Sequence, residues 1–390
     1  MSFDFWHILY GTDLILFIAV SLTTLYMGIF AVASLFSRHT ATQAGKHQNR
    51  FIVIIPSYKG DHSVEATVKS VLGQSYPMRL FDVTVVSDHQ QEMTNFRLAQ
   101  YPITLLTPNF KNSTKGKSLQ LAINNLPQFK IYDIVLILDS GNIVEPDFLE
   151  RMNEAFETAG TKAIQAHRVS KNRDTAIANL DAIFEEVNNS IFRRGHITLG
   201  LSSAITGGGV AFDFKWFKDN VGRVKTAWED KEIEAMLMRQ HIFVDYFDNI
   251  MVYDEKTRHT HEFNRQRGRW AATQFRSILS NIRYLPVALL NRQYDWADKI
   301  IQWMLIPRTI LVAIICAMSA ILPFIYMTLA VKWWILFILL MLVFAIATPD
   351  YLVDKNWDKS FLKAPLIIIS SFFHMIGVLR SRKQLENTNR

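Results

Sequence analysis

The stretch that decides the fold is Tyr132-Asp-Ile-Val-Leu-Ile-Leu-Asp-Ser-Gly-Asn142, near the middle of the chain. Its five apolar residues, Ile134 to Leu138, predict a fully buried strand, and Asp139 and a turn follow them. In an open α/β sheet, ligands bind just beyond the carboxyl ends of the strands, so Asp139 is in a position to contact a ligand or a metal. A strand end followed by an ordinary turn would also explain this stretch, so the neighbouring sequence has to decide.

Strands and helices alternate around this central strand. The predicted strands are 51–55, stopped by Pro56, then 81–86, ending on Ser87-Asp88, and 103–106. The predicted helices are 63–72, 118–126, 147–159 and 174–192. Strands that alternate with helices imply an α/β domain with a largely parallel sheet.

The N-terminal region predicts a membrane anchor. Residues 14–36 carry no charge and are long enough to span a bilayer. Asp4 and Asp13 precede this run and no Lys or Arg does, which favours an uncleaved anchor over a signal peptide. Arg38, Lys46 and Arg50 follow it, so the positive-inside rule places residue 40 onward in the cytoplasm.

The C-terminal third predicts further membrane helices, in three apolar runs at about 305–327, 329–347 and 361–379. With the anchor, four spans would leave the C-terminus outside, whereas Arg380, Arg382 and Lys383 favour the cytoplasm. We prefer four spans; the alternative is that one run is interfacial or re-entrant. Residues 273–290 predict an amphipathic helix in the membrane interface, or else an ordinary surface helix.

Composition narrows the classes of function. The net charge is +7 and the pI about 9.3, which suits anionic partners. The basic residues cluster beside the apolar runs, where the positive-inside rule accounts for them, so we expect no nucleic-acid partner. A single cysteine, Cys316, leaves no disulfide within the chain and no cysteine-based zinc site. A transporter is not expected either, because four spans around an α/β domain offer little for transport.

Five groups of residues in the middle of the chain are candidates for binding or catalysis. In order they are Pro56 to Asp61, Asp88, Lys115-Gly-Lys117, Asp139, and Glu229-Asp230 followed by Gln266-Arg-Gly-Arg-Trp270. Transfer from a diphosphate-activated sugar needs these residue types. Arg or Lys neutralises the leaving diphosphate, a carboxylate deprotonates the acceptor hydroxyl, and an aromatic ring stacks on a sugar.

In this order the groups resemble the membrane-integrated family 2 glycosyltransferases, which include cellulose, hyaluronan, chitin and poly-N-acetylglucosamine synthases. Residues 266–270 fit the Q-(Q/R)-x-R-W signature of the processive members. The resemblance implies a GT-A-type, mostly parallel sheet domain between an N-terminal membrane helix and C-terminal membrane helices. The implied regions are an anchor at 1–37, the cytoplasmic GT-A domain at 50–270, an interface helix at 271–299, membrane helices at 300–380 and a polar tail at 381–390.

The resemblance also implies a role for each matching residue. Asp230 matches the general base of the T-E-D motif. The matches on the donor side are Pro56, Tyr58, Asp61, Asp88, Lys117, Asp139, Gln266, Arg267 and Arg269, with Tyr58 and Asp88 at the nucleoside and Asp139 at the diphosphate and its divalent cation, Mg²⁺ or Mn²⁺. The matches on the acceptor side are Gly207, Gly208, Gly209, Trp228, Glu229 and Trp270.

Three positions depart from the family pattern. Gly141 replaces the second aspartate of D-x-D, which leaves Asp139 as the carboxylate for a cation, with Asn142 as a candidate to assist it. Lys59-Gly60 replaces the usual Asn-Glu after Tyr58, with Asp61 one place late. Trp228 stands where threonine is usual, and its ring is expected to shape the acceptor pocket.

The resemblance implies an inverting enzyme of the inner membrane that uses a nucleotide sugar, expected to be a UDP-sugar, to elongate a polysaccharide. Its partners would be the donor, a saccharide or lipid-linked acceptor, membrane lipids and accessory secretion subunits. Two alternatives stay open: transfer of a single sugar to a membrane lipid, and an inactive membrane subunit with a degenerate metal site.

Overall fold

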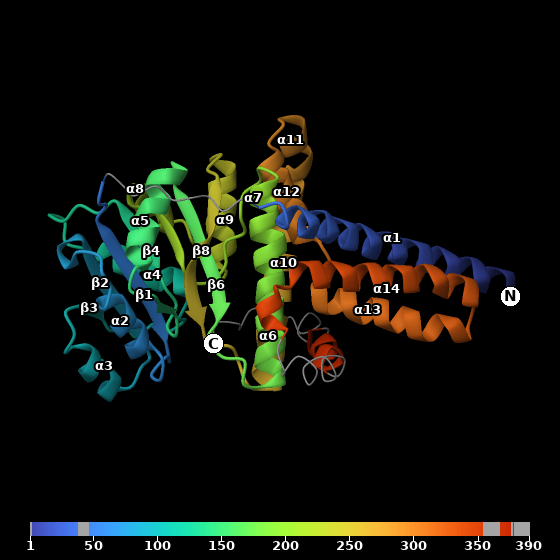
Figure 1. Cartoon of the computed structure of the whole chain (residues 1–390), viewed down its shortest axis with the longest axis horizontal. Coiled ribbons are helices and arrows are strands. Elements are labelled where there is room, and N and C mark those ends of the chain that lie inside the picture. The colour runs from blue at the N-terminus through green and yellow to red at the C-terminus, as the bar shows by residue number, and fades with distance from the viewer. Residues whose placement is uncertain (1, 38–46, 354–366, 376, 378–390) are drawn as a thin grey trace.

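The computed structural model describes residues 2–37, 47–353, 367–375 and 377. An α/β domain lies at one end of the molecule and long apolar helices lie at the other (Figure 1). Helix α10 (Thr260–Asn281) lies across the junction between them (Figure 1). The structure therefore confirms an α/β domain set between N-terminal and C-terminal apolar helices.

The α/β domain is built on one eight-stranded sheet, in the order β3-β2-β1-β4-β7-β6-β8-β5. The strands are β1 (Phe51–Tyr58), β2 (Phe81–Asp88), β3 (Thr104–Leu106), β4 (Ile134–Ile137), β5 (Ile143–Val144), β6 (Ala163–Ser170), β7 (Val210–Asp213) and β8 (Val244–Asp254). The first half, from β3 to β4, is parallel as predicted. The second half is mixed, because β7 runs antiparallel to both β4 and β6, and β5 runs antiparallel to β8.

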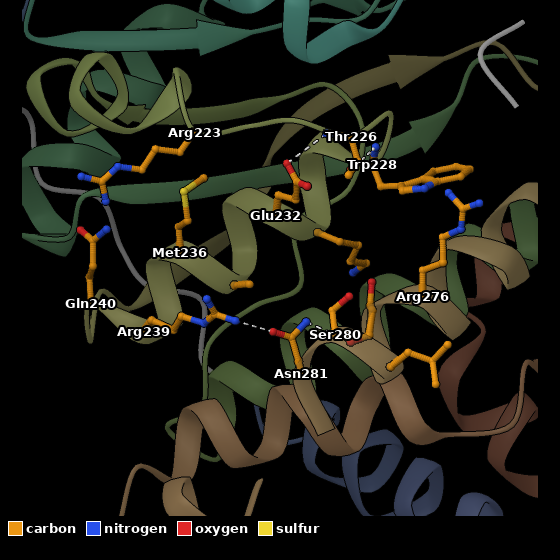
Figure 2. Close-up of a pocket in the computed structure, with 14 residues that line it drawn as sticks. Arg223, Thr226, Trp228, Glu232, Met236, Arg239, Gln240, Arg276, Ser280 and Asn281 are labelled. Atoms are coloured by element: carbon orange, nitrogen blue, oxygen red, sulfur yellow. Dashed lines mark hydrogen bonds between the residues drawn. The ribbon is translucent and has the colours of Figure 1, made fainter. Parts of the chain in front are cut away.

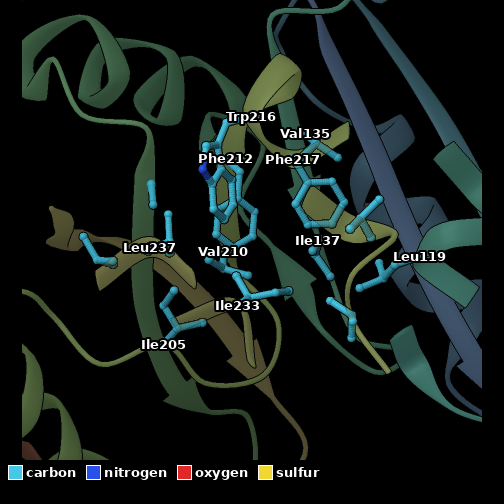
Figure 3. Packing of buried hydrophobic residues seen from close by; sticks show 14 of the residues in the cluster. Leu119, Val135, Ile137, Ile205, Val210, Phe212, Trp216, Phe217, Ile233 and Leu237 are labelled. Carbon is cyan, nitrogen blue, oxygen red and sulfur yellow. The ribbon is translucent and has the colours of Figure 1, made fainter. Parts of the chain in front are cut away.

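Burial on both faces explains why the central strands are continuous apolar runs. Along β1, Ile52 and Ile54 pack into one hydrophobic cluster, whereas Phe51, Val53 and Ile55 pack into the other. β4 divides its residues in the same way. Figure 3 shows the first cluster, in which Phe212 and Phe217 stack with ring centroids 5.2 Å apart.

Helices cover both faces of the sheet. They are α2 (Val64–Leu72), α3 (Glu92–Leu98), α4 (Lys115–Asn124), α5 (Phe148–Ala159), α6 (Ala176–Asn188), α7 (His196–Thr198), α8 (Phe214–Val221) and α9 (Glu229–Arg239). Two of them differ from the prediction in ways that affect the site. Helix α4 begins at Lys115 rather than Ser118, and α6 continues through a π-helical segment, Asn189–Gly195, directly into α7.

Among the described residues, two helices are long and apolar enough to cross a membrane, within α1 (Ser2–Ser34) and α14 (Met327–Ala347). They pack side by side (Figure 1). The predicted span at 305–327 contains α13 (Arg308–Ile321) and a 3₁₀ turn to Phe324, and α12 (Tyr294–Met304) precedes it. The two segments Tyr294–Met304 and Arg308–Phe324 are bent by 53° at the break between them and together could form a third span. Of the predicted run at 361–379, the structure describes residues 367–375 and 377, which are helical, and the others lie outside the described residues.

The predicted interface helix at 273–290 is in fact two helices. The first, α10, begins thirteen residues earlier, at Thr260, and carries the Gln266 to Trp270 motif on the same helix as the amphipathic stretch. It ends at Asn281, and a short 3₁₀ turn leads to α11 (Leu285–Leu290), which has Pro286 in its first turn. The motif therefore shares one helix with the first part of the predicted interface segment, residues 273–281.

Gly195 lets the α/β domain approach the first membrane helix closely. A Cβ atom at this position would overlap the backbone carbonyl of Phe30 on α1. We expect Gly195→Ala to lower the free energy of unfolding by about 1–3 kcal/mol, the usual range for overpacking. The control is Gly222→Ala, where a Cβ would meet nothing within 4 Å. Thermal unfolding in detergent measures both, and equal midpoints for the two variants would contradict this contact.

Candidate active site

A cavity of about 540 Å³ lies where the sheet domain meets α9, α10 and the membrane helices. The predicted site residues that line it are Asp139, Gly207, Trp228, Glu229, Asp230, Gln266, Arg269 and Trp270. Its lining also includes Met27 of α1 and several residues around the break between α12 and α13, among them Trp303, Leu305, Pro307 and Arg308. The cavity thus joins predicted catalytic side chains to the N-terminal and C-terminal apolar helices.

Lys115 is the electrostatic centre of this cavity. Its Nζ lies 2.7 Å from Asp139 Oδ1, 3.5 Å from Glu229 Oε1 and 3.9 Å from Asp230 Oδ1. Burial would raise the pKa of Asp139, but the Lys115 ammonium outweighs it and holds that pKa below its ordinary value. One lysine therefore keeps Asp139 ionised and joins the three carboxylates.

The structure at the start of α4 explains why Lys115, and not Lys117, contacts Asp139. Thr114 caps α4, and its hydroxyl accepts a hydrogen bond from the Lys117 backbone N–H. Residues two apart on a helix point in nearly opposite directions, so only one of the two lysines can face Asp139. Lys117 instead donates from Nζ to the backbone carbonyl of Asn112 at 2.6 Å. The structure therefore brings Lys115 and not Lys117 into the cavity lining, and the donor contact of Lys117 stays a prediction.

Asp230 and the glycine loop hold each other in place. Asp230 Oδ2 accepts a hydrogen bond from the Gly207 backbone N–H at 2.9 Å. Gly207 has φ of +62°, and a Cβ on Gly208 would overlap the side-chain oxygen of Asn142. Gly208 and Gly209 therefore pack against the turn after β4 and against β6 and β8, and Gly207 alone of the three lines the cavity.

Glu229 carries a strongly perturbed carboxyl. Burial, together with the neighbouring Asp230, raises its pKa to about 8. The carboxyl is therefore protonated at neutral pH and ionises as the pH rises through about 8. A new negative charge beside Asp230 would disfavour an anionic donor in the same cavity.

We expect the rate of transfer to fall as the pH rises above about 8, and Glu229→Gln to abolish this fall because the amide cannot ionise. The measurement is the pH dependence of kcat/KM for both proteins between pH 6 and 10. Identical profiles would show that another group controls the alkaline limb.

A second charged cluster, which the sequence did not predict, lies behind the first. Arg168 Nη2 is 2.6 Å from Asp254, and Lys256 lies 3.1 Å from Asp254 and 3.5 Å from Glu185. Arg193, in the π-helical segment, is 3.2 Å from Glu185. Burial would raise the pKa of Glu185, but these cations hold it well below its ordinary value. Arg168 and Asp254 sit at the ends of β6 and β8, where the strand-end rule would have found them had these strands been predicted.

The carboxyl ends of β1 and β2 meet beside this site. Tyr58 and Asp88 are register partners on these parallel strands, and the next residue of each, Lys59 and His89, has positive φ. Such strained non-glycine residues cluster at functional sites. Asp61 Oδ1 accepts the Gln91 backbone N–H at 2.8 Å, which ties the two loops together. Pro56 lies within β1, which continues to Tyr58 and does not stop before the proline.

The residues of the Gln266 to Trp270 motif differ in their surroundings. Gln266, Arg269 and Trp270 line the cavity, as do Thr273 and Gln274 on the following turn. Arg267 is buried and does not line the cavity, and its guanidinium carbon lies 4.6 Å from the centroid of the Trp270 ring. Its guanidinium donates to Asp181 at 2.5 Å and lies over the ring of Phe184, with 4.8 Å between the guanidinium carbon and the ring centroid. The structure therefore places Arg267 in the packing between α10 and α6, outside the cavity lining.

The side chains around Asp139 fit a cation that arrives with the donor better than one held by the protein alone. Within the described residues, no group of three His, Cys, Asp or Glu side chains is arranged around a common metal position. Asn142 Oδ1 already accepts the Asp139 backbone N–H, and Lys115 contacts one Asp139 oxygen. Gly141 has φ of +101°, so a carboxylate there would be strained. One carboxylate plus phosphate oxygens and water suits Mg²⁺.

Comparisons with known proteins agree with this geometry. The mannosyltransferase PcManGT from Pyrobaculum calidifontis, solved with GDP-Man and Mn²⁺, superposes with a TM-score of 0.54 over 85% of this chain and 98% of its own, at 14% identity. The hyaluronan synthase of Streptococcus pyogenes is 27% identical over 135 residues, which is about a third of each chain. The model of the family described as "Glycosyltransferase like family 2" matches residues 47–273, more than half of the chain. This chain therefore belongs to the family 2 glycosyltransferases and is a transferase.

Proposed function

We propose that this protein is an inverting membrane glycosyltransferase that uses a nucleotide-diphosphate sugar, a UDP-sugar, to elongate a polysaccharide. The observation that carries the proposal is the single cavity that holds Asp230, Lys115 and Asp139 and also reaches Met27 and the residues around Arg308. A cavity of this composition suits an acceptor that reacts at the carboxylates and extends toward the membrane helices.

The ends of β1 and β2 support the donor side of this proposal. Asp88 Oδ1 bonds to His89 Nδ1 at 2.6 Å, whereas its Oδ2 is buried without a hydrogen-bond partner in the described part of the chain. A buried acceptor atom without a partner is costly unless a ligand supplies a donor. An N–H of a pyrimidine base or a hydroxyl of ribose would satisfy it, and the half-exposed ring of Tyr58 lies on the adjacent strand end.

The proposed transfer reaction uses Asp230 on the acceptor side of Lys115 and Asp139 on its donor side. Asp230 accepts the proton of the acceptor hydroxyl, whose oxygen then attacks the anomeric carbon opposite the diphosphate, so that the configuration inverts. The bond between that carbon and the diphosphate oxygen breaks, and Lys115 and Arg269 are placed to neutralise the charge that develops there. Asp139 would hold a divalent cation, which adds positive charge at the same diphosphate. Trp270 supplies an aromatic face for the acceptor sugar.

The location of the protein follows from the same arrangement. In the described part of the chain, two helices are long and apolar enough to span a membrane, or three if the bent pair counts as one, which supports a multi-pass protein of the inner membrane with a cytoplasmic catalytic domain. Export of the product through the membrane helices, with accessory secretion subunits, is part of this proposal. Because the cavity also reaches the membrane helices, a single transfer to a lipid acceptor is the second candidate.

Membrane vesicles that contain the protein test the proposal. Radiolabelled UDP-sugars and GDP-mannose are offered one at a time, with Mg²⁺, with Mn²⁺ or with EDTA, and the product is divided between aqueous and organic phases. We expect label from one UDP-sugar in the aqueous or insoluble fraction. Label confined to the organic phase would favour the single-transfer candidate, and no incorporation from any donor would contradict both.

A further inference from the structure

A second cavity, of about 730 Å³, lies between α9 and α10. It shares Trp228 and Lys231 with the catalytic cavity, so the start of α9 forms a wall of both. Arg223 and Gln240 lie at one end of it, and Trp228 and Arg276 lie at the other (Figure 2). Neither the donor nor the acceptor residues described above explain this cavity.

The lining of this cavity is strongly cationic. Arg223, Arg239 and Arg276 line the cavity with a single carboxylate, Glu232, and the fourth cation of the lining, Lys231, is ion-paired at 2.8 Å to Glu234 outside the lining. Glu232 is already engaged, because its Oε2 accepts the backbone N–H groups of Lys225 and Thr226 at 2.8 and 3.4 Å. The excess of positive charge therefore favours an anionic ligand.

Two of these cations are held in fixed positions. Arg239 donates from Nη2 to Asn281 Oδ1 at 2.7 Å, and its guanidinium carbon lies 4.7 Å from the centroid of the Tyr284 ring and 5.6 Å from that of Trp296. Arg276 lies over the Trp228 ring at 6.0 Å. Stacked guanidinium groups are preorganised to bind phosphate or carboxylate oxygens. Ser277 and Ser280 add hydroxyl groups to the same lining.

The rim of the cavity is apolar and exposed. Leu279 lines the cavity and is 64% exposed, and it lies one helical turn from Phe275 and near Ile282, which are also exposed. The exposed surface continues on α11, where Leu290 is 82% exposed. Helix α10 lies at the junction with the membrane helices (Figure 1). A cationic pocket beside exposed apolar side chains at this level matches the two parts of an anionic phospholipid.

We propose that the cavity between α9 and α10 binds the headgroup of an anionic phospholipid, whose acyl chains lie along the exposed apolar side chains of α10 and α11. The phosphate contacts Arg239 and Arg276, and the Trp228 ring closes the end nearest the catalytic cavity. Trp228 directly precedes Glu229 and Asp230 on the chain, so an occupied cavity also supports the segment that presents the catalytic carboxylate.

The first test measures lipid affinity on the full chain in detergent by native mass spectrometry. The probes are phosphatidylglycerol and phosphatidylcholine with identical acyl chains. We expect phosphatidylglycerol to bind at least tenfold more tightly, and the double variant Arg239→Gln/Arg276→Gln to weaken its binding about thirtyfold. The control, Lys215→Gln/Lys218→Gln on α8, removes the same charge from exposed positions outside the cavity. Equal affinity for the two lipids, or equal loss in the two double variants, would overturn the proposal.

Two further measurements separate a lipid from a soluble anion. Leu279→Gln should weaken phosphatidylglycerol binding severalfold, because it removes an apolar contact at the rim, and inorganic phosphate at millimolar concentration should not displace the lipid. Displacement by inorganic phosphate, with no effect of Leu279→Gln, would show a soluble-anion site and overturn the lipid proposal. If the arginine double variant fails to fold, Arg223→Gln, at an exposed residue, must show a smaller loss in the same direction. These measurements need no sugar transfer, so their outcome is independent of the proposed enzymatic activity.

Discussion

Asp230→Asn is expected to lower the rate of sugar transfer by about a thousandfold, within the range that positioned general bases contribute. The asparagine can still accept the Gly207 N–H that fixes Asp230 at 2.9 Å, so the glycine loop should keep its position. It cannot take the proton of the acceptor hydroxyl. Donor binding should stay within a few-fold of the original, because Lys115, Asp139 and the ends of β1 and β2 are unchanged.

The measurement is kcat for sugar transfer together with the Kd for the nucleoside diphosphate by calorimetry. Asp219→Asn on α8, an exposed carboxylate outside the catalytic cavity, is the matched control and should keep the original rate. An Asp230→Asn protein that retains a tenth or more of the rate would show that another group is the base.

Lys115→Met is expected to lower kcat/KM by about a hundredfold to a thousandfold, comparable to the loss of one electrostatic contact in an active site. The lysine contacts Asp139, Glu229 and Asp230 together, and two of these, Asp139 and Asp230, are charged while Glu229 is protonated. Without the lysine, the two carboxylates face each other and face an anionic donor. Methionine fills a similar volume, so loss of the charge dominates the effect.

The neighbouring lysine makes this experiment specific. Lys117→Met removes an identical charge two residues away, from a side chain that bonds to the Asn112 carbonyl. We expect its effect to be at most a few-fold. The measurement is kcat/KM for the donor in both variants, with the Kd of Mn²⁺ in the presence of the nucleoside diphosphate as a second readout. A larger effect at Lys117 would restore the role that the sequence motif assigned to it.

The first half of the sheet, from β3 to β4, could be predicted from sequence because its buried residues are also apolar. Residues 51–55 and 134–138 are continuous apolar runs, and the structure buries them on both faces. The second half could not be predicted in this way. In β6, Gln165 and His167 are buried and polar, and their partners lie far away in sequence: His167 Nε2 bonds to Glu186 at 2.9 Å. Such strands look like loops until the tertiary contacts are known.

The sequence could predict which types of residue form the site, but it could predict less well which of them face the cavity. The residues of α10 that line the cavity, at 266, 269, 270, 273 and 274, recur with the helical period, but this period does not separate them from 267, which lies seven residues before 274. The burial of Arg267 against Asp181 is a tertiary contact, and the start of the helix at Thr260 is obscured by charged and polar residues. The pairing of Lys115 with three carboxylates depends on where α4 begins, and helix boundaries are the least reliable part of a sequence-based assignment. Arg168 and Glu185 carry no local signal beyond a charged residue beside an apolar run.

The measurement that tests the central claim most directly is the size of the product at an early time, when little of the donor has been consumed. Vesicles that contain the protein receive one labelled UDP-sugar with an excess of acceptor, and the product is sized by gel electrophoresis, with Asp230→Asn as the blank. The account predicts long chains from the earliest samples, because the acceptor end stays in a cavity that reaches from Asp230 to the membrane helices. A product of one added sugar that partitions with lipid at every time would contradict it.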